Sequence, residues 1–521
     1  MAAILAPFPT AIAAIDTLGA FRGLRCILNR MMEPKIGSVA SEKAPTPAEA
    51  VPATAAQLIT SERLILDDYL RRGERLPTEV RHLFEAKYDN PVKEPKLGSY
   101  RDPSRKKSVT ADAEVLQAMF KKWGEIDAFL EAGPRRKLAF AEPEKPEDAL
   151  IVGMVTTGGL APGLNSVVHS IVERHTATYH KLLGEGSVWG FLDSFKGLAQ
   201  NREPKYIKLT TDVTEDWLDK GGAELGALRW ERSASVAADI AGKLERFGVR
   251  ILYVIGGDGS MAAAHEIAMA AKETIVVGVP KTMDNDVLWA WQSFGFNTAV
   301  ERAAAFVNTM HCEAEATRRV AILEFFGAKS GFVAANAALA SGHVDLVMVP
   351  EVFTGMNKQE ADATLDLYRK YLAATIRRKR EKPHAVVVIA EGVGDVLAQL
   401  GVLARGEGKH FPDMFSKSLS LANVGGETVP SFTIEPRYYV RAAPANSHDQ
   451  VYCKRLGALA VDNALAGYTD FMISQWLTEY VLVPLALVTG GQKRIPPGGI
   501  FWKQVESSTG QPTVDPHSLC P

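Results

Sequence analysis

Short runs of apolar and β-branched residues recur from about residue 150 onward and alternate with amphipathic stretches. The runs predict buried strands at 150–157, 250–255, 274–280, 319–324, 344–350 and 384–390. Apolar residues at helical spacing predict helices between them, among others over 164–175, 261–272 and 358–380. Alternating buried strands and helices favour an α/β fold with largely parallel sheets. Because ligands of such folds bind beyond the carboxyl ends of the strands, the residues directly after each strand are the first candidates for a site.

The character of the sequence divides the chain into four segments. Residues 1–57 include a stretch rich in Ala, Pro, Ser and Thr, and we expect a flexible N-terminal segment there. Residues 58–145 carry charged, amphipathic runs that predict a helical N-terminal extension. Residues 146–510 are the α/β region, and residues 511–521 are expected to be a C-terminal tail.

Charge and cysteine content narrow the range of partners. The chain has 59 Lys and Arg against 61 Asp and Glu, a formal net charge of −2. This balance gives no electrostatic reason to expect nucleic acid or an anionic membrane as a partner. The four cysteines are widely spaced and form no CxxC pair, so we expect neither a thiolate zinc site nor a disulfide scaffold.

No segment has the pattern of a transmembrane helix. The apolar run 480–488 is too short and contains Pro484. No Lys or Arg precedes Arg22, so the charged start of a secretory signal is missing. We therefore expect a cytoplasmic protein, with an N-terminal plastid or mitochondrial transit peptide as the alternative.

Two glycine-rich turns follow predicted strands. Residues 158–165 read GGLAPGLN, and glycines there let backbone N–H groups approach an anion, although a tight turn without ligand fits equally well. Residues 256–260 read GGDGS and embed Asp258 among glycines. A carboxylate in a phosphate-binding turn suits Mg²⁺, and a helix cap by Asp258 or Ser260 is the structural alternative.

A third turn, PKTMDND at 280–286, follows the predicted strand 274–280. It places two carboxylates, Asp284 and Asp286, beside a lysine and a hydroxyl. Such a group is costly to bury unless it binds something. One carboxylate can accept a proton from a substrate hydroxyl while the other serves a metal.

Together and in this order, the three turns resemble the phosphofructokinase family. Further matching motifs are GGAELGALR at 221–229, GFNTAVE at 295–301, AEG at 390–392 and PRYYVRAAPANSHDQVYC at 436–453. GGDG turns also occur in NAD and diacylglycerol kinases, but the PKTMDND loop separates this family from them. The resemblance covers residues 151–510. It implies a phosphofructokinase-like subunit of two interleaved, doubly wound α/β subdomains that uses Mg²⁺ and assembles as a homodimer or homotetramer.

The resemblance also implies an activity, the phosphorylation of fructose 6-phosphate at its 1-hydroxyl in glycolysis. The residues that match catalytic positions are Asp284 as the base, Thr282 and Arg229. Those that match substrate-binding positions are Lys281, Asp286, Arg319, Phe326, Gly327, Glu391, Tyr438 and Arg441. Arg319 matches an arginine that reaches the neighbouring subunit's site. Those that match donor-binding positions are Gly158, Gly159, Arg229, Gly257, Asp258, Gly259 and Ser260, with Asp258 as the Mg²⁺ ligand.

Two residues bear on the phosphoryl donor, which in this family is ATP or pyrophosphate. Pyrophosphate users typically carry Asp after GGD, where it would repel an α-phosphate, and this chain has Gly259. Lys281 occurs in pyrophosphate enzymes and also in long ATP-dependent ones. The pair favours ATP, with a pyrophosphate-dependent phosphotransferase as the alternative.

The chain departs from the family's pattern at three positions. The family's MGR motif becomes Phe326-Gly327-Ala328, and the neighbouring Lys329 could replace the missing positive charge. Phe432 stands where related long enzymes often have a lysine. Ser194 stands where the family usually has a glycine. Ala328 and Phe432 raise the alternative of a non-catalytic regulatory paralogue. The intact Asp258, Asp284, Asp286 and Arg441 argue against it.

Overall fold

The structure is a computed structural model that describes residues 149–514 except 185, 200–202, 229–233, 420–422, 425–426 and 477–478. The described residues all fall within one compact unit of the chain. The segments expected as a flexible N-terminus, 1–57, and as a helical extension, 58–145, lie outside the described residues, as does Arg229. None of the helices in the described part is long and apolar enough to cross a lipid bilayer.

A large seven-stranded sheet forms the first lobe, in the order β13-β12-β5-β4-β1-β2-β3. Its five central strands are parallel, and the edge strands β13 and β3 are antiparallel to their neighbours. The strands are β1 (Ile151–Thr156), β2 (Val188–Phe191), β3 (Tyr206–Lys208), β4 (Val249–Gly256), β5 (Ile275–Pro280), β12 (Phe471–Trp476) and β13 (Glu479–Pro484).

Helices cover both faces of this sheet, because successive side chains of its strands point to opposite sides. Ile251, Tyr253 and Ile255 of β4 pack in one apolar core, while Leu252 and Val254 pack in the other. The first core is completed by α6 (Leu164–Glu173) and α18 (Ser447–Leu465), with α8 (Thr211–Glu215) against α6. The second is completed by α7 (Ser194–Ala199), α9 (Ala234–Arg246), α10 (Asp258–Ala270) and α19 (Leu485–Val488).

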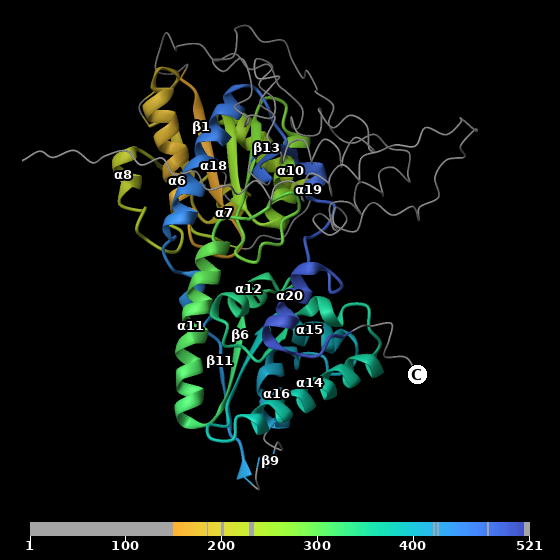
Figure 1. Cartoon of the computed structure of the whole chain (residues 1–521). Coiled ribbons are helices and arrows are strands. Elements are labelled where there is room, and N and C mark those ends of the chain that lie inside the picture. Colours follow the sequence, from red (N-terminus) through yellow and green to blue (C-terminus); the bar gives the residue numbers. More distant parts are fainter. Residues whose placement is uncertain are drawn as a thin grey trace, which may run out of the picture. The chain divides into compact units, whose positions relative to one another are not determined.

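The second lobe is built on a parallel four-stranded sheet with one continuous apolar core (Figure 1). The strand order is β11-β6-β8-β7, with β6 (Val320–Phe325), β7 (Leu346–Met348), β8 (Ala385–Ala390) and β11 (Ser431–Ile434). Its helices are α11 (Phe296–Thr317), α12 (Phe332–Ser341), α13 (Pro350–Phe353), α14 (Lys358–Arg378), α15 (Gly392–Gln399), α16 (Phe411–Leu419), α17 (Arg437–Arg441) and α20 (Ile500–Thr509). A small ribbon of β9 (Asn423–Val424) and β10 (Glu427–Thr428) is appended.

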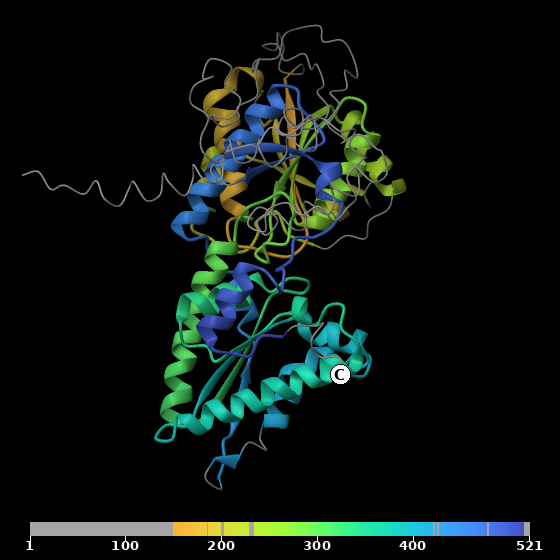
Figure 2. The same cartoon turned by 45° about the vertical axis from the view of Figure 1, so that its right-hand side comes forward.

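The chain passes between the lobes three times (Figure 2). It leaves the first lobe at α11, returns between α17 and α18, and leaves again after α19 to form α20. The last described residues close the second lobe, because the Gln511 side chain pairs with both backbone groups of Val347 at the edge of β7. The sheets are therefore interleaved in sequence, as the resemblance implies.

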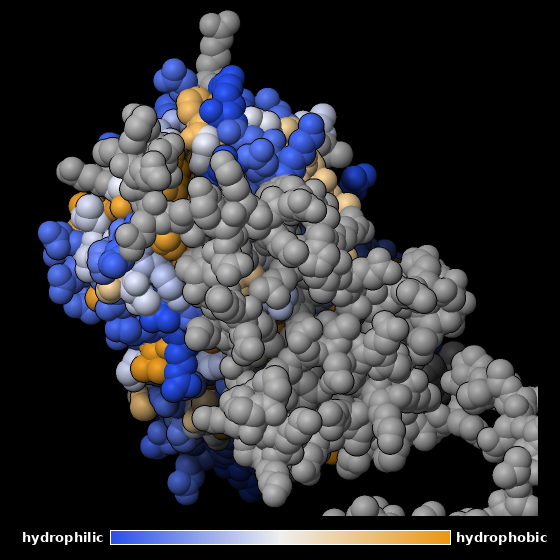
Figure 3. All heavy atoms as spheres, turned by 90° about the horizontal axis from the view of Figure 1, so that it is seen from above, coloured by the Kyte–Doolittle hydropathy of each residue, from blue (hydrophilic) through white to orange (hydrophobic). Residues whose placement is uncertain are grey.

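The predicted α/β architecture is confirmed. The six predicted strands appear as β1, β4, β5, β6, β7 and β8. The helix predicted at 261–272 begins earlier, at Asp258, so that the GGDG turn forms the start of α10. In the view from above, the described residues that remain visible are mostly hydrophilic, and hydrophobic ones occur among them in small groups (Figure 3).

Candidate active site

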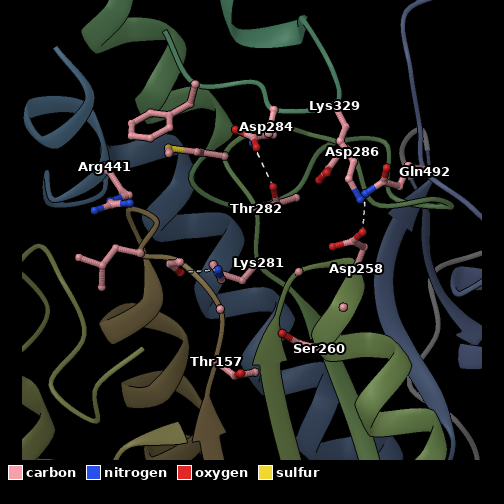
Figure 4. A pocket seen from close by; sticks show the side chains of 18 of the residues that line it. Thr157, Asp258, Ser260, Lys281, Thr282, Asp284, Asp286, Lys329, Arg441 and Gln492 are labelled. Atoms are coloured by element: carbon pink, nitrogen blue, oxygen red, sulfur yellow. Dashed lines mark hydrogen bonds between the residues drawn. The ribbon is translucent and has the colours of Figure 1, made fainter. Parts of the chain in front are cut away.

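The carboxyl ends of strands from both sheets meet at a cavity of about 610 Å³ (Figure 4). The large sheet contributes the turns after β1, β4 and β5, and the small sheet contributes those after β6 and β8 together with α17. This is the position at which ligands bind in open α/β sheets. The site therefore needs both lobes.

The GGDG turn presents a helix N-terminus to the cavity. Gly257 is the N-cap of α10, and its carbonyl oxygen accepts hydrogen bonds from the N–H groups of Ser260 (3.0 Å) and Met261 (2.9 Å). First-turn N–H groups and the helix dipole favour an anion there. A Cβ atom added at Gly259 would meet nothing within 4 Å, so the turn is open on that side.

The PKTMDND loop is fastened to the GGDG turn and to the last crossing segment. The Lys281 N–H donates to the Gly256 carbonyl oxygen at 2.9 Å. Asn285 adopts a left-handed backbone, with φ of 54°, which asparagine tolerates better than most residues. Its Oδ1 atom accepts hydrogen bonds from the Ser293 N–H (3.1 Å) and Lys493 Nζ (3.0 Å). Asp284 and Asp286 are thereby fixed on either side of Asn285.

Asp284 is a buried carboxyl with an unusual charge state. Burial, together with the nearby carboxylates Asp286 and Glu391, raises the pKa of Asp284 to about 8, although Lys281 acts in the opposite direction. Its Oδ1 atom has no hydrogen-bond partner within the described residues. The raised pKa gives the ionised carboxylate a high proton affinity, which suits a general base, and the positive charge of Lys281 favours that ionised form.

Asp258 and Asp286 fit a divalent cation. Burial raises the pKa of Asp286, and the nearby charge of Asp258 raises it further, while a hydrogen bond with Thr282 and the charge of Lys493 act in the opposite direction. Mg²⁺ prefers oxygen ligands and is usually held by one or two carboxylates plus substrate phosphates. A Gln492 side-chain amide donates a hydrogen bond to Asp258 Oδ2 and orients that carboxylate (Figure 4).

The opposite end of the cavity suits an anionic, hydroxyl-bearing ligand. The guanidinium of Arg441 lies between the rings of Phe326 and Tyr438, at 5.5 and 5.3 Å from their centroids. Its Nε atom is buried and has no partner in the part of the chain that the structure describes. Glu391, the N-cap of α15, lies nearby and supplies a carboxylate acceptor.

The cavity brings together most of the residues singled out in the sequence. The cavity is lined by Gly158, Gly159, Gly257, Asp258, Gly259, Ser260, Lys281, Thr282, Asp284, Asp286, Phe326, Glu391, Tyr438 and Arg441. Gly327 has a structural reason for its identity, since an added Cβ would lie 2.2 Å from the Ser330 carbonyl oxygen. Ala328 and Lys329 also line the cavity.

Arg319 lies elsewhere. It precedes β6, at the amino end of the strand, whereas the cavity is at the carboxyl end. Its guanidinium lies 4.7 Å from the centroid of the Phe432 ring. Phe432 therefore packs on Arg319 instead of facing the cavity. The predicted role of Arg319 in a neighbouring subunit's site remains a prediction.

Among the lining residues to which the sequence assigned no role are Phe195, Gln492 and Arg437. Arg437 lies within the matching motif at 436–453, but the resemblance gives roles there only to Tyr438 and Arg441. Gln492 belongs to a connecting segment without a motif. Phe195 follows Ser194 in α7, a segment of the sequence noted only for its missing glycine.

Comparison with known proteins identifies the family. A family model described as Phosphofructokinase matches residues 151–464. The chain belongs to the phosphofructokinase family. The ATP-dependent 6-phosphofructokinase of Borreliella burgdorferi is 32% identical over 85% of this chain and 99% of its own length. That of Amycolatopsis methanolica is 34% identical over 83% of this chain and 94% of its own length.

Solved structures agree on the phosphofructokinase fold. Pichia pastoris phosphofructokinase in the T-state aligns with a TM-score of 0.53 at 19% identity, over 72% of this chain and 41% of that chain. A pyrophosphate-dependent phosphofructokinase from Nitrosospira multiformis aligns with a TM-score of 0.52 at 16% identity, over 66% and 85%. At these identities the likeness concerns the fold alone.

Proposed function

We propose that the protein transfers the terminal phosphoryl group of ATP to the 1-hydroxyl of fructose 6-phosphate, giving fructose 1,6-bisphosphate in glycolysis. The observation that carries the proposal is Asp284, a buried carboxyl whose pKa is raised to about 8, in a cavity between a phosphate-binding turn and a sugar-binding end. Both named relatives are ATP-dependent 6-phosphofructokinases, which supports the same assignment.

Asp284 accepts the proton of the attacking hydroxyl. Phosphoryl transfer needs in-line positioning, charge neutralisation and a base at the acceptor. Thr282 touches the transferring phosphoryl group, and Lys281 adds positive charge at the same turn. Asp258 and Asp286 hold Mg²⁺, which, when bound, neutralises the charge of the donor phosphates.

The sugar phosphate binds at the end of the cavity formed by the second lobe. Arg441 pairs with the 6-phosphate, because its planar guanidinium forms charge-assisted hydrogen bonds with phosphate oxygens. Its buried Nε atom, which has no hydrogen-bond partner among the described residues, supports this role. Glu391 accepts hydrogen bonds from sugar hydroxyls. Arg319 reaches a neighbouring subunit's site in a homo-oligomer.

ATP is the preferred donor because the turn is open at Gly259. An aspartate there would repel an α-phosphate, which pyrophosphate lacks. The pyrophosphate-dependent reaction is the second candidate, favoured by Lys281.

The experiment is a product analysis of the purified protein by ³¹P NMR. With fructose 6-phosphate, ATP and Mg²⁺, the sugar's 1-phosphate resonance appears and ADP forms in equal amount. Omitting the sugar phosphate is the control. Binding of both substrates without product would support the non-catalytic alternative and overturn the proposal.

A further inference from the structure

Three neighbouring parallel strands end in charged residues that meet beside the cavity. Glu324 lies in β6, Glu391 directly follows β8, and Arg437 follows β11 as the first residue of α17. The strand order β11-β6-β8 places the three positions side by side at one edge of the small sheet.

Arg437 joins the two carboxylates. One of its terminal nitrogens donates to Glu324 Oε2, and the other donates to Glu391 Oε1 at 3.1 Å. The side chain of Glu324 is 2% exposed, whereas Arg437 is 23% and Glu391 31% exposed. The arginine is thus anchored on a buried carboxylate and holds a second carboxylate that faces the cavity.

This contact fixes Glu391. In the part of the chain that the structure describes, the Arg437 guanidinium is the group that hydrogen-bonds the Glu391 carboxylate. A rigid fork restricts the rotamers of a glutamate more than a single point charge does. The contact also limits local repulsion, since Glu435 brings a third carboxylate within 3.4 Å of Arg437 Nε.

Because Glu324 is buried, the three charged residues depend on Arg437 to balance its charge. Burial raises the pKa of Glu324 to about 7, while Arg437 acts to lower it. Without Arg437, a buried carboxylate would lose its counter-charge, and Glu391 would lose its restraint. These two effects are separable by mutation.

We propose that Arg437 is a positioning residue for sugar-phosphate recognition, which orients Glu391 toward the sugar hydroxyls through a clamp anchored on Glu324. This inference rests on the proposed function. It also gives the cavity a second arginine beside Arg441, although Ala328 stands where the family's motif has an arginine.

The test measures the Kd of fructose 6-phosphate by calorimetry and kcat at saturating sugar phosphate. Arg437→Ala should raise the Kd about 10- to 100-fold, the range for a hydrogen bond to a charged group, and leave kcat nearly unchanged. Arg437→Lys should recover part of the loss. Arg405→Ala, at an exposed arginine, is the matched control and should leave the Kd at the wild-type value.

Two combined variants separate positioning from structural support. Arg437→Met with Glu324→Gln removes the buried charge together with its partner, so it should restore the Tm but not the Kd. In a Glu391→Gln background, Arg437→Ala should add little, because the two residues act as one unit.

Three outcomes would overturn the inference. These are a wild-type Kd in Arg437→Ala, recovery of the Kd in the Met/Gln variant, and full additivity with Glu391→Gln. Failure of the wild-type protein to bind fructose 6-phosphate would instead remove the proposed function and this inference with it.

Discussion

At the residue scale, the site depends on groups held in states that the unfolded chain does not favour. Asp284 holds a proton to about pH 8 because it is buried among carboxylates. Ser194 has a left-handed backbone, with φ of 61°, at a position where the family usually has glycine. Both residues lie at the cavity or next to one of its lining residues, so both connect local energetics to function.

Asp284→Asn should abolish turnover and stabilise the free protein. Loss of a general base typically costs 10²- to 10⁴-fold in rate, roughly. Because the folded-state pKa is raised from 3.8 to about 8, the carboxyl's contribution to stability is present below about pH 4 and is lost as pH rises through about 8. Thermal melts from pH 5 to 8 should therefore show a Tm advantage of the variant that grows with pH.

Asp239→Asn, at an exposed carboxylate of α9 that pairs with Lys243, is the matched control variant. An unchanged kcat in Asp284→Asn would remove the residue from the role of base. If the Tm of Asp284→Asn exceeded that of the wild-type protein by less as the pH rose, the raised pKa of Asp284 would be contradicted.

Ser194→Gly should raise the free energy of unfolding by about 1 kcal/mol. Glycine removes the cost of a left-handed backbone, which is about 1–2 kcal/mol for a non-glycine residue. It also gives the unfolded chain more conformational freedom, which destabilises the folded state by about 0.5–1 kcal/mol. The buried Ser194 Oγ also has no partner among the described residues. Ser194→Ala keeps the Cβ atom and removes the hydroxyl. It should therefore regain only the part of the free energy of unfolding that the buried hydroxyl costs. Urea denaturation of the three proteins measures this, and a loss of stability in Ser194→Gly would contradict the strained backbone.

At the element scale, the site is assembled where strands of two sheets end. Most of the lining residues follow β1, β4, β5, β6 or β8, so continuous apolar runs were enough to predict them. This worked because central parallel strands are buried on both faces and carry few polar residues. Roles of individual residues came from the family resemblance rather than from the pattern.

The edge elements were not predictable in this way. The four residues of β11 are only half-buried and include Ser431 and Thr433, so the strand left no clear signal, and the motif that contains Arg437 gave that residue no role. Gln492 and Lys493 belong to a connecting segment that reaches the cavity through tertiary packing alone. Their roles depend on residues more than 200 positions away in the sequence.

Lys493→Met should loosen the PKTMDND loop. The Lys493 Nζ atom donates to Asn285 Oδ1 and to the Trp291 carbonyl oxygen, and its backbone N–H donates to the Asp286 carbonyl oxygen at 2.8 Å. Loss of the charge-assisted bonds, about 1.5–3 kcal/mol, should lower kcat/KM for the donor at least about tenfold. Steady-state kinetics measure the effect. Lys503→Met, at an exposed position of α20, is the control, and equal effects of both variants would contradict the role.

At the scale of the whole molecule, two interleaved lobes share one cavity, with the GGDG and PKTMDND turns on the large sheet and Arg441 and Glu391 on the small one. The three crossings of the chain bind the lobes together at the site. The proposed function places donor and acceptor on different lobes, and we expect that donor specificity can be changed without touching the residues proposed to bind the sugar.

Gly259→Asp should impair the use of ATP selectively. A Cβ atom there meets open space and the backbone φ is not positive, so the substitution should be tolerated structurally. A carboxylate about 4 Å from a phosphate oxygen costs on the order of 4 kcal/mol at an effective dielectric near 20, about a thousandfold in kcat/KM. Gly259→Ala controls for the side chain itself. Equal losses with ATP and pyrophosphate would contradict the donor geometry.

The most direct test of the proposed function compares the two donors on one preparation of the wild-type protein. Turnover of fructose 6-phosphate is measured with Mg²⁺ and either ATP or pyrophosphate at equal concentration. The proposed function predicts turnover with ATP and a much lower kcat/KM with pyrophosphate. Turnover with pyrophosphate but not with ATP would contradict it, because Lys281 would then outweigh the open turn at Gly259.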